Sequence, residues 1–267
     1  MEDLSLNYDV EETINALSRK YGLTKNKVRA AIMRNNKDIP PTTPNRALYN
    51  FFRSVYPANI PLPMSHLRAD ALLSNNTEIT FVINATGGTT PQPVERRLPI
   101  TNTFEVLEIS LRIYKIATTT TSKQTAKLYT YVNPFVFSGV GEAAALQSIF
   151  SGGVLQYRLD NEILYPAIDC NRFERVPTTQ EGTVTAVDNA GVVFGRQQRD
   201  GVDKDSNFIE NIPSNTLNGN GQNTYLIKLP EAQNMAGTGA TENWACLVLR
   251  GFEGISGTKQ DNRKVSI

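Results

Sequence analysis

The stretch FEVLEISLRIYKI, from Phe104 to Ile116, decides which fold the sequence predicts. Side chains of successive residues in an extended chain point to opposite faces, so a period of two is typical of a strand. One face of this stretch carries aliphatic residues, which are Leu107, Ile109, Leu111 and Ile113. The other face mixes apolar with polar residues. The pattern predicts a long β-strand whose aliphatic face lies in a core.

Shorter stretches on both sides share this enrichment in β-branched and aromatic residues. They are the strand candidates 79–83, 127–137, 154–159, 163–165, 183–194, 224–229 and 244–252. Asp160 and Asn161 predict a hairpin turn, and Pro134 predicts a bulge or an edge. One helix is expected at 141–150, and long polar loops at 196–223 and 230–243. Many strands with few helices favour a mainly β fold, an antiparallel β-sandwich or jelly roll, preceded by a short helical N-terminal region.

The composition limits what kind of protein this is. Of its 267 residues, 40% are hydrophobic, enough for a sizeable core, and the formal net charge is +1. A protein with so little net charge does not resist packing against copies of itself. No apolar run reaches the roughly 18 residues of a membrane-spanning helix, so no such span is expected. Cys170 and Cys246 stand in apolar stretches and are interpreted as buried, reduced thiols.

Basic residues concentrate near the N-terminus, where the chain has nine of them and one acid, Asp38, between Arg19 and Arg53. Such asymmetry points to a region with a partner of its own. Apolar residues at three-, four- and seven-residue spacings predict helices there. We expect a basic helical hairpin over residues 1–36, in which Gly22 ends the first helix.

The segment INALSRKYGLTKNKVRAAI, residues 14–32, has a pattern that resembles the helix-turn-helix of DNA-binding proteins. Thr24 would cap a second helix whose basic face can meet phosphates. The residues expected to contact nucleic acid are Lys20, Thr24, Lys25, Lys27, Arg29 and Arg34. One alternative is a hairpin that packs on the protein's own assembly and leaves its lysines in solvent. Nonspecific contact with nucleic acid is another, because attraction to phosphates requires only charge.

Six prolines break up the next region, residues 37–66. Between them, residues 46–56 suit a short helix with an aromatic face. We interpret the region as an arm or linker whose rings contact a neighbouring subunit, and these rings belong to Tyr49, Phe51, Phe52 and Tyr56. The β-sandwich domain is then expected to occupy residues 67–267.

No arrangement of catalytic or metal-binding residues stands out in the sequence. His66 is the single histidine and has no evident partner for nucleophilic catalysis. Acidic pairs such as Glu105 with Glu108 could act as glycosidase carboxylates, but a solvated strand edge explains them equally well. Three aspartates in residues 200–205 loosely follow a calcium loop that lacks its closing glutamate. We therefore expect no enzyme activity, no cofactor and no metal.

With these strands placed, the β region resembles the jelly-roll coat proteins of tailless icosahedral bacteriophages. The resemblance covers about residues 67–267 and rests on the long strand at 103–109, the block GGVLQYRLDNEILYP at 152–166, and loops rich in Thr, Asn and Gly. It implies a capsid subunit, a structural protein of the virion that self-assembles in the host cytoplasm. Its implied partners are copies of itself and other virion proteins, with nucleic acid as an open alternative for the basic region.

Two other functions stay open. The chain could be a helix-turn-helix DNA-binding protein whose β domain senses a ligand, which would need a dimer and a discrete operator. It could also be a carbohydrate- or receptor-binding β-sandwich, for which aromatic side chains exposed on one sheet face are expected. Trp244 stands among Ala245, Cys246 and Leu247, a setting typical of a core. A hydrolase ranks last for want of catalytic residues.

Overall fold

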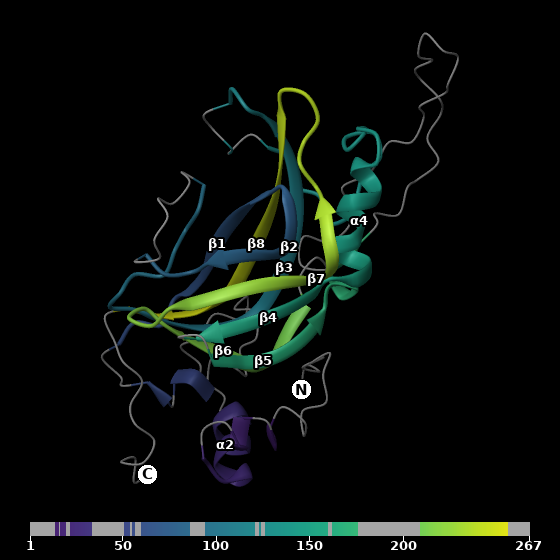
Figure 1. Cartoon of the computed structure of the whole chain (residues 1–267). Coiled ribbons are helices and arrows are strands. Elements are labelled where there is room, and N and C mark those ends of the chain that lie inside the picture. The colour runs from purple at the N-terminus through teal and green to yellow at the C-terminus, as the bar shows by residue number, and fades with distance from the viewer. Residues whose placement is uncertain are drawn as a thin grey trace, which may run out of the picture.

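Two antiparallel sheets face each other across an apolar core and form a β-sandwich (Figure 1). The prediction of a mainly β fold with an antiparallel sandwich is therefore confirmed. None of the helices in the described part of the chain is long and apolar enough to cross a membrane. The computed structural model describes residues 14–15, 17–19, 22–33, 51–53, 55–56, 60–85, 94–120, 123, 126–159, 162–175 and 209–255.

The two sheets have four strands each. The first has the order β1-β8-β3-β6, with β1 at Met64–Leu73, β8 at Thr241–Gly254, β3 at Thr103–Ala117 and β6 at Ile209–Asn218. The second has the order β2-β7-β4-β5, with β2 at Asn75–Val82, β7 at Asn223–Asn234, β4 at Val154–Leu159 and β5 at Glu162–Asp169. Neighbouring strands are antiparallel throughout. Among these pairs, β1 meets β8, β2 meets β7, β3 meets β6 and β4 meets β5.

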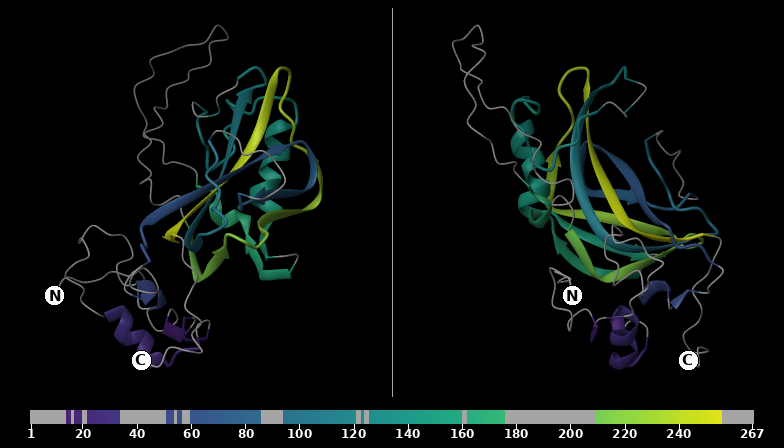
Figure 2. Two further views of the ribbon diagram at one scale, coloured as in Figure 1. Left: turned by 90° about the vertical axis from the view of Figure 1, so that its left-hand side faces the viewer. Right: turned by 180° about the vertical axis from the view of Figure 1, so that it is seen from behind.

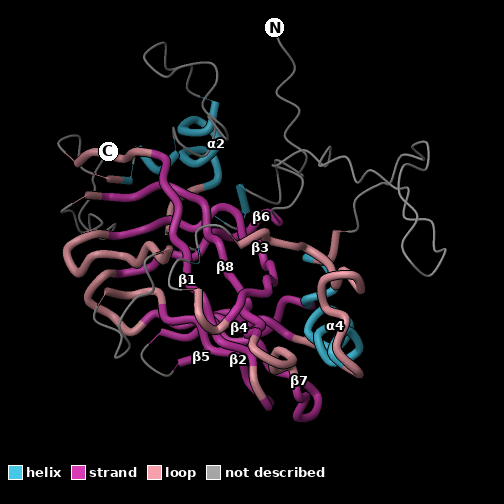
Figure 3. The backbone as a smooth tube through the Cα atoms, turned by 90° about the horizontal axis from the view of Figure 1, so that it is seen from above, coloured by secondary structure: helices cyan, strands magenta, loops and turns pink. Residues whose placement is uncertain are grey.

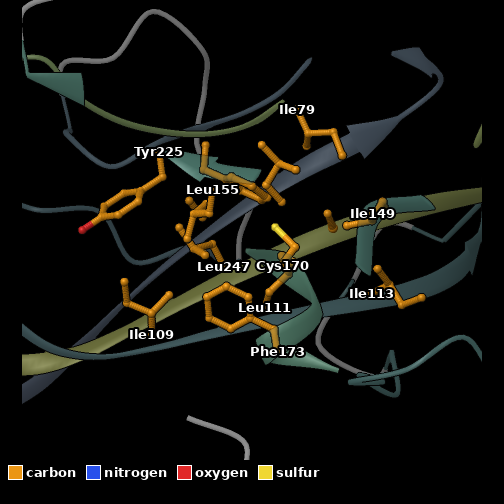
Figure 4. Close-up of a cluster of buried hydrophobic side chains, with 14 of the residues drawn as sticks. Ile79, Ile109, Leu111, Ile113, Ile149, Leu155, Cys170, Phe173, Tyr225 and Leu247 are labelled. Atoms are coloured by element: carbon orange, nitrogen blue, oxygen red, sulfur yellow. The ribbon is translucent and has the colours of Figure 1, made fainter. Parts of the chain in front are cut away.

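The long strand β3 supplies the aliphatic layer that the sequence predicts. Its residues Ile109, Leu111 and Ile113 are buried and belong to one cluster with Leu155 and Tyr225 of the second sheet (Figure 4). Burial of apolar surface between two such faces is the main source of stability in a sandwich.

A β-bulge in β3 changes the face of one predicted core residue. The register between β3 and both of its neighbours shifts between Val106 and Glu108. A bulge breaks the alternation of side chains by one residue. Leu107 consequently packs in a second cluster, outside the layer formed by Ile109. The prediction that Leu107 and Ile109 share one face is wrong for this reason.

Helical elements accompany the sheets, among them α4, η2 and α2. The helix α4 spans Glu142–Gly152, as the sequence predicts, and it packs against β7 and against the 3-10 helix η2 at Cys170–Phe173. The helix α2 spans Lys25–Met33. Seen from above, α4 lies beside β7 and well away from α2 (Figure 3).

The strand predictions hold for most of the described chain but fail in one place. Residues 127–137 do not form the predicted strand, and Tyr129 makes only an isolated bridge to Ile113. Pro134 lacks an N–H for a ladder, and Asn133 draws the chain into a turn. The strands β1 and β6 occupy residues where no strand is predicted. The predicted strand at 183–194 lies outside the described residues.

The sandwich has two ends that differ in what packs there (Figure 2). At one end β1 and β3 begin and β8 finishes, and we call this the α2 end because α2 lies beyond it. At the other, β3 finishes and β8 begins, and we call this the α4 end because Lys115 of β3 contacts Glu142 of α4 there.

Candidate functional site: a basic helix on an aromatic support

The basic helix α2 begins at a tight turn. Gly22 has a φ of 63°, in the left-handed region that glycine adopts without strain. The N–H of Leu23 donates to the carbonyl of Ser18 at 3.2 Å, a bond typical of a helix C-terminus. Oγ1 of Thr24 then accepts a hydrogen bond from the N–H of Lys27 at 3.4 Å, as the side chain of an N-cap residue does. The full hairpin at 1–36 extends beyond the described residues and stays a prediction.

One face of α2 is anchored, whereas its basic side chains are open to solvent. Val28 is fully buried, whereas Thr24, Lys25, Lys27 and Arg29 are exposed. The sequence of α2 has no acidic residue, so its exposed surface is basic. The remaining two predicted contact residues, Lys20 and Arg34, lie outside the described part of the chain.

An aromatic segment of the arm joins α2 to the sandwich. Residues 51–53 are helical, and Phe52 packs tilted against Phe252 of β8 with ring centroids 6.0 Å apart. Phe51 meets the Phe52 ring edge-on at 5.4 Å. The second buried cluster unites these rings with both neighbouring elements, and it comprises Ile14, Leu17, Val28, Phe51, Phe52, Val55, Tyr56, Ile60, Leu62, Leu107 and Phe252.

A buried polar contact fixes the arm to β3. The hydroxyl of Tyr56 donates to Oε1 of Glu105 at 3.1 Å and shares a hydrogen bond with Oγ1 of Thr103, also at 3.1 Å. Oγ1 of Thr216 donates to the same carboxylate at 2.9 Å. Burial, together with the negative charge of Glu105, raises the pKa of Tyr56 above its usual value of about 10. The hydroxyl therefore stays protonated and able to donate.

These contacts give the predicted inter-subunit rings a partner within their own chain. Phe51, Phe52 and Tyr56 are almost fully buried there, and Tyr49 lies outside the described residues. Their predicted contact with a neighbouring subunit stays a prediction. The sequence did not reveal their docking partners, because Leu107 reaches this cluster only through the bulge in β3.

Charged residues gather on the outer face of the first sheet. Arg68 forms a two-pronged ion pair with Asp70 at 3.0 Å, and Arg250 lies 3.8 Å from Glu108. His66 stands near these arginines. Partial burial and the positive charges of Arg96, Arg250 and Arg68 lower the pKa of His66 below 6.5. The imidazole is therefore neutral at pH 7.

The cysteines are packing residues. Both thiols are free and buried. Burial raises the pKa of Cys170 to about 12 and that of Cys246 well above its usual value, so neither is a ready nucleophile. Trp244, beside Cys246, is buried under Lys123 and stacks on Tyr114 at 6.3 Å. The interpretation of both cysteines as buried, reduced thiols is confirmed, and Trp244 is buried with Cys246 in a small cluster separate from the main core.

The acidic residues named as candidate catalysts do not gather around an open site. Glu105 is fully buried beneath Tyr56, while Glu108 faces Arg250. Within the described ranges, no group of three or more His, Cys, Asp and Glu side chains is arranged to hold a metal ion. The aspartates at 200–205 lie outside these ranges.

No protein-family model matches the chain, and no curated protein shows significant sequence similarity to it. Its function is therefore inferred from the strand pairing and from the surfaces described above.

Proposed function

We propose that this chain is a coat subunit that assembles with copies of itself into a virion shell, and that its sandwich is a jelly roll. The observation that supports this most directly is the pairing of first strand with last. The pairs β1/β8, β2/β7, β3/β6 and β4/β5 result when one long hairpin of eight strands is rolled into two sheets. Viral coat domains use this arrangement, as do lectins and cupins.

The fold alone does not assign the function. Coat domains, lectins and cupins can be distinguished by the side chains that they expose. A sugar-binding sandwich needs exposed aromatic rings on a sheet face. Trp244 and Tyr114 lie on the outer face of the first sheet, but both are buried. A cupin needs a cluster of metal ligands, which the described residues lack. These observations favour the coat subunit over both.

The basic face of α2 supports a second role for the same subunit, contact with nucleic acid. Lys25, Lys27 and Arg29 are exposed on a helix without acids, which suits phosphate attraction. Replacing all three by Gln should weaken binding to any nucleic acid and reduce the slope of log affinity against log salt by about 3 for a duplex. Lys228→Gln, an exposed change on β7, is the matched control and should alter neither.

The same titration tests the alternative of a DNA-binding regulator. A regulator would keep its preference for one DNA sequence as salt rises, since base contacts carry that preference. A coat subunit that binds phosphates would lose affinity for all sequences alike.

The direct test of the coat function is electron microscopy of the purified full-length protein, with and without nucleic acid. We expect closed particles of one size, or defined rings that are fragments of them. A monomer that stays monomeric at high concentration and binds a sugar or another small ligand in fixed ratio would overturn the proposal.

A further inference from the structure

The outer face of the first sheet carries an arginine on each of three neighbouring strands. They are Arg68 of β1, Arg250 of β8 and Arg112 of β3, and together with His66 they form what we call the arginine face. The register pairs His66 with Arg250, and Arg68 and Arg112 follow at steps of two residues along the strands. With strands about 4.8 Å apart and a rise of about 3.4 Å per residue, the three Cα atoms lie within roughly 15 Å of one another. Their long side chains can therefore reach one bound molecule.

In the ion pairs of this face, the positive partner is the one turned toward solvent. The side chain of Arg68 is 18% exposed, whereas that of Asp70, its partner at 3.0 Å, is fully buried. The side chain of Arg250 is 31% exposed, against 19% for Glu108 at 3.8 Å. A guanidinium has five N–H donors, so it can hold a carboxylate beneath it and still donate outward. A molecule that approaches this face therefore meets basic groups first.

The arginines of this face also repel one another. Burial, together with the positive charges of Arg250 and Arg68, lowers the pKa of Arg112 below its usual value. Partial burial lowers the pKa of His66 as well, and positive charges that include the same two arginines add to this effect. An anion placed among these groups would offset their repulsion. The arginine face is thus suited to a negatively charged ligand.

The arginine face adjoins the basic helix α2 through the aromatic cluster of the arm. Phe252 lies two residues beyond Arg250, on the same side of β8, and it belongs to one buried cluster with Val28 of α2. Lys27 and Arg29, on either side of Val28 in the sequence, are exposed. Two basic surfaces therefore border one cluster. A small anion could occupy only one of them, whereas a polyanion can contact both.

We infer that the arginine face binds the phosphate backbone of a nucleic acid that also contacts α2. Arginine binds phosphate oxygens through two parallel N–H bonds and sheds its water more readily than lysine does. Contacts of this kind position the nucleic acid without reading its sequence. The inference rests on the proposed nucleic-acid contact of the coat subunit. It adds a second site for that contact and assigns the outer face of the first sheet to the side of the subunit that meets the genome.

The salt dependence of duplex binding tests this site. Arg112→Gln together with Arg250→Gln removes two phosphate contacts and should reduce the slope of log affinity against log salt by about 2. The matched control combines Arg172→Gln on η2 with Lys228→Gln on β7, and it removes two exposed charges outside the first sheet. The control should leave the slope unchanged. Adding the triple change in α2 to the arginine double variant should reduce the slope by about 5 in all, because the two sites act independently.

Thermal unfolding shows whether the arginine double variant folds like the native protein. If its Tm falls, Arg250→Gln alone replaces it, since that side chain is 31% exposed and its pair with Glu108 is long. The slope should then decrease by about 1.

The single histidine reports directly on contact at the arginine face. In isotope-labelled full-length protein kept below its assembly concentration, saturating duplex places negative charge beside His66 and should raise the pKa of its imidazole in NMR titrations. The rise should persist in the α2 triple variant, where duplex contacts the arginine face alone, and should shrink in the arginine double variant. A rise with inorganic phosphate and none with duplex would assign the face to a small anion and refute the inference.

Each remaining outcome decides a different point. A slope that is unchanged in the arginine double variant but reduced in the α2 triple variant would sink the arginine face and leave the contact at α2 intact. A native protein that binds no duplex would overturn the proposed nucleic-acid role and this inference together. A His66 pKa of 6.5 or higher in the protein alone would mean that acidic side chains of a protein already cover the face, which contradicts the inference.

Discussion

The hydroxyl of Tyr56 offers a sharp test of how the arm is attached, because Tyr56→Phe removes only this oxygen, with its bonds to Glu105 and Thr103. The stronger of the two lost bonds goes to the buried carboxylate of Glu105 at 3.1 Å, because that partner is charged. Hydrogen bonds to charged groups are worth about 1.5–3 kcal/mol. With an unfolding entropy of roughly 0.56 kcal/mol/K for a chain of this length, a loss of about 2 kcal/mol lowers Tm by about 4 °C.

The assay is urea denaturation followed by Trp244 fluorescence, with Tyr157→Phe as the comparison. Tyr157 donates at 2.8 Å to the neutral amide of Asn223, so its loss should cost less, about 0.5–1.5 kcal/mol. Thr216→Val removes a second donor to Glu105, and the double variant with Tyr56→Phe should cost more than the sum of the two. A Tyr56→Phe variant within about 0.5 kcal/mol of the native protein would refute the docking of the arm on its own sandwich.

Other predictions concern pH, a single imidazole and a close backbone contact. Burial raises the pKa of Glu142, but hydrogen bonds from Lys115, Asn243 and the N–H of Gly139 outweigh it and lower that pKa below 4.5. The ionised carboxylate therefore contributes fully to the free energy of unfolding above pH 4.5, and this contribution is lost as the pH falls further. Glu142→Gln should make the free energy of unfolding less dependent on pH in this acid range, as measured by denaturation at a series of pH values. The imidazole of His66 should titrate below pH 6.5 by NMR, and Arg96→Gln should raise its pKa; a native value of 6.5 or higher would contradict the lowered pKa. Gly251→Ala places a Cβ 1.8 Å from a carbonyl oxygen of β3 and should destabilise the fold by several kcal/mol or prevent folding, measured by soluble yield and thermal unfolding; a near-native Tm would contradict the close approach.

The sequence predicted those elements whose side chains repeat with a clear period. The alternation in residues 104–116 predicted β3, and the run of good helix formers after Gly141 predicted α4. It missed β1, where the inward positions include Ala69 and Ala71, because alanine is depleted in strands. It also missed β6, where Asn, Pro and Ser interrupt the alternation and pairing with β3 decides the structure. The residues of one strand do not show which other strand will pair with it.

The candidate site could be predicted only in part. The exposed basic side chains of α2 follow from composition and helical spacing. The packing of Phe52 on Phe252 and the bond from Tyr56 to Glu105 join segments far apart in the sequence. Leu107 joins the same cluster through the bulge in β3, a backbone feature that the residue pattern does not predict.

The mass of the purified full-length protein, followed by sedimentation velocity as its concentration rises, tests the central claim most directly. A coat subunit should pass from small species to one large particle of fixed size over a narrow range of concentration. A single species with the 29.5 kDa mass of one chain across the whole range would contradict it.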